Sequence, residues 1–249
     1  MKYLVTGAAG FIGAVTCQKL LAAGHVVVGI DNLNNYYDVN LKLARLAQFE
    51  SHEAFTFIKL DISARPAMSE LFKTQLFDKV IHLAAQAGVR YSIENPDAYA
   101  DSNLVGHLNV LEGCRNTKVK HLVYASSSSV YGLNEKTPFE TTDSVADVVP
   151  RRNDQWTVEQ GTPASSSAPY AVYNIGHGSP ISLMDFVKAI EDELRIEAKK
   201  EFREMQPGDV YQTYADTQDL FAATGYKPQV CIKEGVTEFI TWYKGFYNK

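Results

Sequence analysis

Short hydrophobic runs alternate with longer amphipathic segments along the first half of the chain. The short runs are rich in β-branched and aromatic residues, which is typical of strands. They predict strands at residues 2–7, 25–31, 55–61, 78–85 and 120–132. Apolar residues at helical spacing predict helices at residues 13–24, 40–50, 67–75 and 99–117. This alternation predicts an α/β fold with a doubly wound parallel sheet. The nearly continuous apolar strands agree, because helices cover both faces of such a sheet.

The pattern changes after residue 132. Residues 134–169 form a long, polar, proline-containing stretch that predicts no helix. A run of that length without regular structure is unusual inside one compact domain. We therefore expect two domains, comprising residues 1–145 and a smaller second lobe at 146–249.

Regular patterns return in the second lobe. They predict a strand at 171–176 and helices at 182–196 and 236–248. The first of these helices is expected to be capped by Ser182, with Asp185 three residues later as a variant of the capping box. The last helix carries an aromatic stripe, which we interpret as core packing.

Composition and charge narrow the possible functions. The 249-residue chain has a net charge of −5, which argues against non-specific nucleic-acid binding but excludes no small anionic ligand. Cys17, Cys114 and Cys231 lie far apart without a C-x-x-C pair, which favours a reducing compartment. No apolar run approaches the roughly 20 residues that span a bilayer. The N-terminal apolar run is interrupted at once by "TGAAG", unlike a signal peptide. We expect a cytoplasmic protein without a membrane segment or a metal site.

The segment "TGAAGFIG" carries the most informative motif. It places Gly7, Gly10 and Gly13 between a predicted strand and a predicted helix, and Asp31 ends the next strand. Glycines at this spacing permit a tight turn, close approach of a pyrophosphate and close helix packing. The pyrophosphate sits at the helix N-terminus, where free backbone N–H groups point outward, here those of Phe11 and Ile12. The alternative, a glycine-rich turn that merely packs, explains fewer of these features. The motif predicts a Rossmann-type dinucleotide site.

The acidic end of the second strand indicates which dinucleotide binds. The Asp31 carboxylate is suited to accept hydrogen bonds from the adenosine ribose and would repel a 2′-phosphate. Asn32 follows it, and no arginine occurs in "DNLNN". The sequence therefore favours NAD over NADP.

The ends of the third and fourth strands supply further cofactor candidates. Asp61 is suited to the adenine and is followed by Ile62, although Asp61 is alternatively a cap for the next helix. The small residues of "HLAA" suit close passage of a cofactor. On the helix after them, Asn103 either contacts the cofactor or ties backbone segments together. The candidates in "HLAA" are Leu83, Ala84 and Ala85.

Together these motifs resemble those of the extended short-chain dehydrogenase/reductase superfamily, and within it the NAD-dependent nucleotide-sugar epimerases and dehydratases. The chain is most similar to UDP-glucuronate (UDP-galacturonate) 4-epimerases. The similarity rests on "MKYLVTGAAGFIG", "HLAAQAGVRYSIENP", "SNLVGHLNVLEGCR", "LVYASSSSVYG", "YNIGHGSPISLMDFVKAIE" and "QPGDVYQTYADT". The resemblance implies tightly held NAD, a UDP-sugar substrate and a homodimer. It also implies chemistry in which the sugar C4 hydroxyl is oxidised to a ketone and hydride returns to the opposite face.

The resemblance also implies roles for individual residues. The family base is a tyrosine in a Tyr-x-x-x-Lys helix, and a serine or threonine after the fifth strand bridges that tyrosine and the substrate. Ser127 best matches this position, with Ser126 and Ser128 beside it. Asp209 of "QPGDV" matches a position that contacts the uridine ribose. Arg90 of "GVRYS" is suited to bind a sugar carboxylate bidentately. The alternative for Arg90 is a surface ion pair with a neighbour such as Glu94.

The chain departs from the family pattern at the catalytic base. None of its fourteen tyrosines is followed by lysine four positions later, the spacing that places both on one helix face. The family pattern runs to "TTDSV" at residues 141–145 and resumes at "ADVVPRRNDQW". We interpret this junction as the loss of a block of several tens of residues that contains the Tyr-x-x-x-Lys helix. The expected fold is thus a Rossmann-type sheet with a small, truncated C-terminal substrate lobe.

Three interpretations of this departure remain open. The chain is an impaired or inactive 4-epimerase, a non-catalytic NAD-binding relative that acts as a sensor or assembly subunit, or the product of a spliced or otherwise shortened gene. Under the first, a substitute base is conceivable, with His177 and Tyr173 as candidates.

Overall fold

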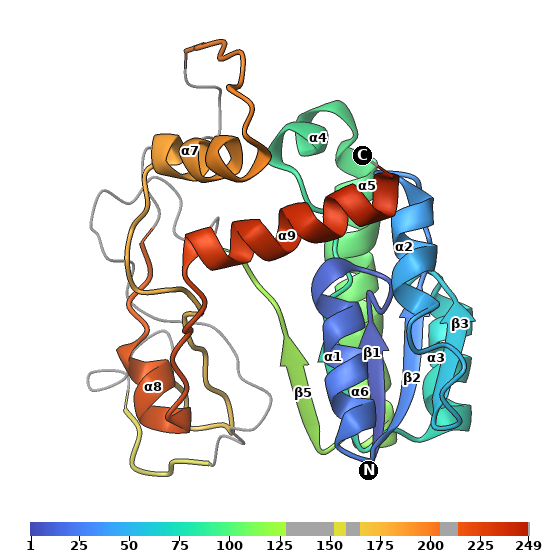
Figure 1. Cartoon of the computed structure of the whole chain (residues 1–249). Coiled ribbons are helices and arrows are strands. Elements are labelled where there is room, and N and C mark those ends of the chain that lie inside the picture. The colour runs from blue at the N-terminus through green and yellow to red at the C-terminus, as the bar shows by residue number, and fades with distance from the viewer. Residues whose placement is uncertain (128–151, 158–164, 205–213, 249) are drawn as a thin grey trace. The chain divides into compact units, whose positions relative to one another are not determined.

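The computed structural model describes residues 1–127, 152–157, 165–204 and 214–248 (Figure 1). The chain divides into two compact units, Met1–Ala125 and Ser126–Lys249. The division falls just after the fifth strand, earlier than the boundary expected near residue 145, which lies outside the described residues.

The first unit is built on a parallel sheet. Its strands are β1 (Lys2–Thr6), β2 (Val26–Asp31), β3 (Phe55–Lys59), β4 (Lys79–His82) and β5 (His121–Tyr124). Their order is β3-β2-β1-β4-β5, and every pairing is parallel. At the centre, Val5 lies opposite Gly29 of β2 and Ile81 of β4. The predicted doubly wound sheet is confirmed, with strands shorter than their apolar runs.

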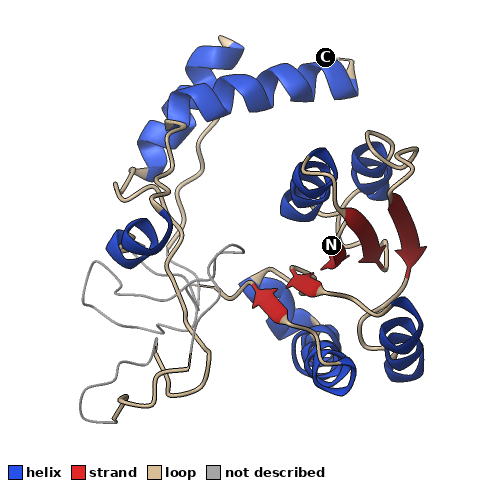
Figure 2. Cartoon of the chain, turned by 90° about the horizontal axis from the view of Figure 1, so that it is seen from below, coloured by secondary structure: helices blue, strands red, loops and turns tan. Residues whose placement is uncertain are grey.

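Helices cover both faces of this sheet (Figure 2). The helices of the first β-α-β units are α1 (Phe11–Ala22) and α2 (Val39–Leu46), and those that follow are α3 (Arg65–Gln75) and α6 (His107–Thr117). Right-handed crossovers place α1 and α2 on one face and α3 and α6 on the other. The helix α1 ends as its sequence predicts, since Gly24 adopts φ +76° just after the C-cap residue Ala23.

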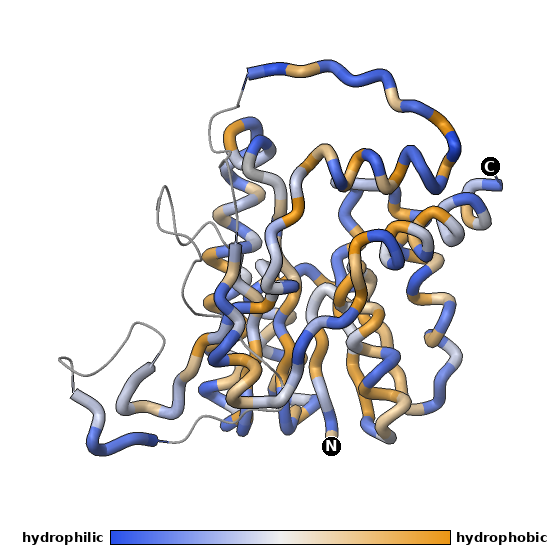
Figure 3. The backbone as a smooth tube through the Cα atoms, turned by 60° about the vertical axis from the view of Figure 1, so that its left-hand side comes forward, coloured by the Kyte–Doolittle hydropathy of each residue, from blue (hydrophilic) through white to orange (hydrophobic). Residues whose placement is uncertain are grey.

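A buried hydrophobic cluster fills the space between the sheet and the helices α3 and α6. The strands around it are mostly hydrophobic (Figure 3). Phe72 of α3 is 1% exposed, and its ring lies against Gly113 of α6, where an added Cβ would come within 2.3 Å of it. This contact explains how α3 and α6 pack closely. The buried members of the cluster are Leu4, Val28, Ile30, Ile62, Met68, Leu71, Phe72, Phe77, Val80 and Val110.

The segment between β4 and β5 differs from the single helix predicted at 99–117. It comprises α4 (Val89–Glu94), α5 (Pro96–Tyr99), a π-helix η1 (Ala100–Gly106) and then α6. Wide π turns occur often at functional sites. Here η1 carries Ser102, which lines a cavity described below, and Asn103.

The second unit contains the helices α7 (Leu183–Leu194), α8 (Gln218–Thr224) and α9 (Ile232–Tyr247). The predicted cap is confirmed, since the hydroxyl of Ser182 accepts a hydrogen bond from the Asp185 amide at 3.0 Å. Thr237 of α9 donates a hydrogen bond to the Glu193 carboxylate of α7 at 2.8 Å.

Two expectations for this unit are wrong. The strand predicted at 171–176 is loop, with only an isolated antiparallel bridge between Ser165 and Ala171 among the described residues. The aromatic stripe of α9 is not core, because its rings contact one another at partly exposed positions and the buried residues of α9 are Val236 and Ile240. In the part of the chain that the structure describes, we find no helix with the length and apolar character needed to cross a membrane.

Candidate functional site

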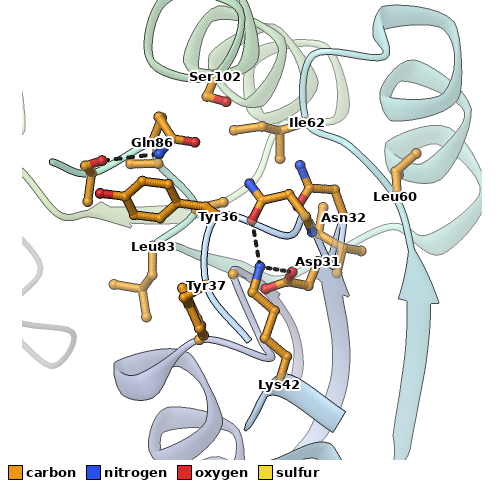
Figure 4. A pocket seen from close by; sticks show the side chains of 17 residues that line it. Asp31, Asn32, Tyr36, Tyr37, Lys42, Leu60, Ile62, Leu83, Gln86 and Ser102 are labelled. Carbon is orange, nitrogen blue, oxygen red and sulfur yellow. Dashed lines mark hydrogen bonds and ion pairs between the residues drawn. The ribbon is translucent and has the colours of Figure 1, made fainter. Parts of the chain in front are cut away.

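A cavity of about 230 Å³ lies at the carboxyl ends of the strands in the first unit (Figure 4). It is built by the segments that follow β1, β2, β3 and β4, beside the point where the strand order reverses. Open α/β sheets bind ligands at this position. Eight of the predicted cofactor residues line the cavity, namely Gly7, Gly10, Asp31, Asn32, Ile62, Leu83, Ala84 and Ala85.

The glycine turn forms one wall of the cavity. Gly7 adopts φ +71°, a conformation that favours glycine, and its carbonyl accepts a hydrogen bond from the Gly10 amide at 2.9 Å. Gly13 does not line the cavity but packs on this turn, since a Cβ on it would lie 2.0 Å from the Gly7 carbonyl oxygen. Phe11 and Ile12 have exposed side chains, so any role for them in binding lies with their backbone.

The N-terminus of α1 suits an anionic group. No side chain caps it, and its first turn holds no acidic residue. The first N–H groups of a helix lack partners within the helix and attract negative charge. The glycine turn, this helix end and the carboxylate of Asp31 together fit a dinucleotide with its pyrophosphate at α1.

Asp31 is held in place at the end of β2 by its neighbours. Its side chain is 8% exposed, its Oδ2 accepts a hydrogen bond from the Ala9 amide at 3.3 Å, and its Oδ1 accepts one from the Leu33 amide at 2.8 Å. The Lys42 Nζ lies 3.4 Å from Oδ1. The carboxylate therefore connects the glycine turn to the strand end.

Asp61 stands behind the cavity rather than in its lining. Its carboxylate accepts hydrogen bonds from the Asn32 side chain at 2.7 Å and from the Ser63 amide and hydroxyl at 2.8 and 2.7 Å. Partial burial raises the pKa of Asp61, but the hydrogen bonds from Asn32 and Ser63 outweigh it and hold that pKa below its ordinary value. Asp61 is not the N-cap of α3, which is Ala64. Asp61 instead orders the turn before α3 and orients Asn32.

Asn103 acts on the backbone, as the alternative interpretation predicts. Its side-chain oxygen accepts a hydrogen bond from the Gln86 amide at 2.8 Å, and its side-chain nitrogen donates one to the Gln86 carbonyl at 3.0 Å. Asn103 does not line the cavity, whereas Gln86 does. The π-helix thus clamps the loop that forms one side of the cavity.

A buried Thr6–His82 pair orders the start of the same loop. The Thr6 hydroxyl accepts hydrogen bonds from the amides of Leu83 and Ala84 at 3.1 and 3.0 Å and lies 2.7 Å from Nδ1 of His82. Because its oxygen already accepts two N–H bonds, the hydroxyl donates to Nδ1, which leaves the His82 proton on Nε2. Burial, with a smaller contribution from His107, lowers the pKa of His82 from 6.5 to about 4.

We expect Thr6→Val to destabilise the protein by about 2–4 kcal/mol and to weaken NAD binding. The substitution leaves the Ala84 N–H and Nδ1 of His82 without their partner, whereas the Leu83 N–H keeps a hydrogen bond to the Thr6 carbonyl at 3.3 Å. Each unsatisfied group costs about 1–3 kcal/mol. Urea unfolding and NAD titration measure both effects. Thr6→Ser keeps the hydroxyl and should restore most of the stability. Thr74→Val removes an exposed hydroxyl and should change stability by less than about 0.5 kcal/mol. A Thr6→Val protein as stable as the Thr74→Val protein would contradict the role assigned to Thr6.

We also expect stability to fall as the pH drops from about 6.5 to about 4, in part because of His82. Its pKa is 6.5 when unfolded and about 4 when folded, so the unfolded chain binds more protons in this window and acid favours unfolding. The loss reaches about 3 kcal/mol at the lower end. Unfolding in urea at several pH values measures it. His82→Asn should show a shallower slope, and equal slopes in both proteins would refute the assignment.

The other predicted site residues lie on different elements. Ser126 and Ser127 are exposed and follow β5, which ends at Tyr124. Arg90 is exposed on α4. Ser128 and Asp209 lie outside the described residues.

Sequence reasoning missed several residues that line the cavity. Asn34, Tyr36 and Tyr37 follow Asp31 closely in the chain, and that proximity was the signal that could have found them. Lys42 comes from α2 and carries the only positive charge among the lining residues in the described part of the chain. The remaining residues that were not predicted are Ile30, Leu60, Gln86, Ala87 and Ser102.

Comparison with known proteins places the chain in a family. Residues 3–153 match the NAD dependent epimerase/dehydratase family. An uncharacterized 37.6 kDa protein of Escherichia coli O111:H- is 43% identical over 334 aligned positions that cover 100% of both chains. A "Probable UDP-glucuronate 4-epimerase" of Rhizobium meliloti is 32% identical and covers 100% of this chain and 98% of its own. The chain belongs to the NAD dependent epimerase/dehydratase family, and its cofactor is NAD.

Solved structures share the fold. The UDP-glucuronic acid 4-epimerase of Bacillus cereus, in complex with UDP-glucuronic acid and NAD, superposes with a TM-score of 0.77 at 24% identity and covers 98% of this chain and 100% of its own. The UDP-glucose 4-epimerase of Bifidobacterium longum, in complex with NAD⁺ and UDP, has a TM-score of 0.80 at 20% identity, covering 100% and 99%. At these identities the likeness establishes the Rossmann-type architecture alone.

Proposed function

We propose that this protein is an NAD-dependent UDP-sugar 4-epimerase that acts on the UDP-glucuronate/UDP-galacturonate pair with low turnover. The observation that carries the proposal is the cavity at the switch point of the sheet, lined by Gly7, Gly10 and Asp31. The names of relatives such as the Rhizobium meliloti protein support the substrate class. The motifs "AGVRYS" and "QPGDV" support it independently.

The chemistry assigns a task to each predicted residue. The residues Gly7, Gly10 and Asp31 would hold NAD, which would supply a hydride acceptor and donor for the sugar C4. The Ser127 hydroxyl is proposed to hydrogen-bond the C4 hydroxyl, and Arg90 to hold the hexuronate carboxylate with a planar, bidentate contact. Asp209 is proposed to bind the uridine ribose. These contacts orient C4, but none of them removes a proton efficiently at neutral pH.

The missing base is the reason that we propose low turnover. The chain contains no Tyr-x-x-x-Lys. Its alignment with the Escherichia coli protein covers all of this 249-residue chain over 334 positions, so at least 85 positions lie opposite a gap in this chain. This length difference supports an internal deletion between residues 145 and 146, where the family pattern breaks. The same two observations favour the second candidate function, a non-catalytic NAD-binding relative.

An NMR time course tests the proposal and its substrate class. Purified protein with NAD is incubated with UDP-glucuronate and, separately, with UDP-glucose, while the anomeric signals of the 4-epimers are followed. We expect slow, protein-dependent formation of UDP-galacturonate and less or no UDP-galactose. Epimerisation of UDP-glucose alone would overturn the substrate assignment. No product from either sugar, with protein that is folded and binds NAD, would leave the non-catalytic candidate.

A further inference from the structure

Lys42 is the cavity residue whose role the cofactor motifs do not explain. It lies on α2, is 5% exposed, and points toward Asp31 (Figure 4). Its Nζ lies 3.4 Å from Oδ1 of Asp31 and donates a hydrogen bond to Oδ1 of Asn34 at 2.9 Å. The same ammonium group lies 5.0 Å from the centroid of the Tyr37 ring. A lysine so buried is rare unless it is paired.

The charges at this end of the cavity balance. Among the described residues of the lining, Asp31 and Lys42 are the charged ones, and each compensates the other. Arg45 stands just outside, where it donates hydrogen bonds to the Ala9 carbonyl at 3.5 Å and to the Tyr37 hydroxyl at 3.1 Å. Asp61 stands behind Asn32 and does not line the cavity. A carboxylate in this setting does not create a strongly negative field.

The unused hydrogen-bonding capacity is one acceptor and one donor. A carboxylate offers about four acceptor positions, of which Asp31 uses three within the described part of the chain, for Leu33, Ala9 and Lys42. An ammonium group has three N–H donors, and Lys42 uses two, for Asp31 and Asn34. A ribose diol, with hydroxyls that both donate and accept, matches this pair.

We propose that Lys42 binds the adenosine ribose together with Asp31 and so helps to determine the preference for NAD over NADP. The ion pair fixes the Asp31 carboxylate as the acceptor for a ribose hydroxyl, and Lys42 supplies the adjacent donor. Asp31 then disfavours NADP by holding Lys42 in the ion pair. Once the Asp31 charge is removed, the positive charge of Lys42 has no counter-ion. The ribose position beside Lys42 then binds a 2′-phosphate. This inference rests on the NAD cavity and not on epimerase activity.

Calorimetric titration of nucleotide-free protein with NAD and with NADP tests this inference by affinity, without turnover. Wild-type protein should prefer NAD. Asp31→Asn should weaken NAD binding about 10-fold and strengthen NADP binding about 10-fold, which corresponds to the loss or gain of one charged hydrogen bond. The gain in NADP affinity should decline as salt is added. Lys42→Met should weaken NAD binding without improving NADP binding.

The double variant separates Lys42 from other sources of positive charge. Asp31→Asn with Lys42→Met carries no unpaired buried charge, so it should fold even where a single variant is destabilised. It should lose the NADP gain of Asp31→Asn. Lys59→Met removes an exposed lysine that does not line the cavity and should leave both affinities unchanged. The proposal is overturned if the double variant binds NADP as well as Asp31→Asn does, since Lys42 would then contribute nothing to phosphate binding.

Discussion

Turnover of UDP-glucuronate by this protein is expected to be at least about 100-fold slower than by the Rhizobium meliloti relative assayed alongside. A positioned acid–base group contributes roughly 10²–10⁴-fold to a proton-transfer step. The chain has no tyrosine followed by lysine at the fourth position, so it lacks both the expected base and the lysine that lowers the pKa of that base. NAD binding is expected to survive, because the described residues that line the cavity all belong to the first unit.

The rate is measured by the NMR time course, with both proteins at equal concentration and with NAD content checked after purification. A rate within 10-fold of the relative would mean that another group accepts the C4 proton. His177→Ala and Tyr173→Phe would then identify it, since only the variant that lacks the substitute base should lose activity. Ser127→Ala separates orientation from proton transfer, because it should reduce any residual rate whichever base acts.

The sequence predicts the first unit well because its signals are local. Glycines at 7, 10 and 13 and an acid at 31, between predicted strands and a helix, are typical of a β-α-β unit, and the structure places Gly7, Gly10 and Asp31 around one cavity. The prediction of a strand at 171–176 was wrong because strand formation depends on non-local pairing. β-propensity is realised only when a partner strand is present. In the described residues that segment forms one isolated bridge, from Ala171 to Ser165.

The residues that tune the site were harder to predict. The helical pattern predicts α2, but the sequence alone does not show that Lys42 turns inward, since buried lysines are rare. Asn103 was expected in a regular helix, whereas the π-helix η1 directs its amide to the backbone of Gln86. Both side chains act through partners on other segments, 8 and 11 positions earlier for Lys42 and 17 positions earlier for Asn103. Such roles depend on tertiary geometry, which no local pattern encodes.

Gly13→Ala is expected to abolish NAD binding and to destabilise the first unit. An added Cβ would lie 2.0 Å from the Gly7 carbonyl oxygen and 2.8 Å from its carbon. These are backbone atoms of the turn that lines the cavity, so relief of the clash requires α1 to move away from the turn. Overpacking of this kind costs about 1–3 kcal/mol, occasionally more. NAD affinity should fall by at least about 100-fold, or about 3 kcal/mol, because the glycine turn and the N-terminus of α1 no longer face the pyrophosphate together.

Gly245→Ala is the matched control for this substitution. Gly245 lies in the helix α9, where an added Cβ meets no atom within 4 Å. Alanine there should stabilise the helix by about 0.5–1 kcal/mol, since glycine loses more conformational freedom on folding. Calorimetric NAD titration and urea unfolding of both variants measure the contrast. If Gly13→Ala binds NAD like the Gly245→Ala protein, close contact between α1 and the glycine turn is not what holds the cofactor. Binding would then depend mainly on Asp31 and the loop after β4, the parts of the cavity that this substitution leaves in place.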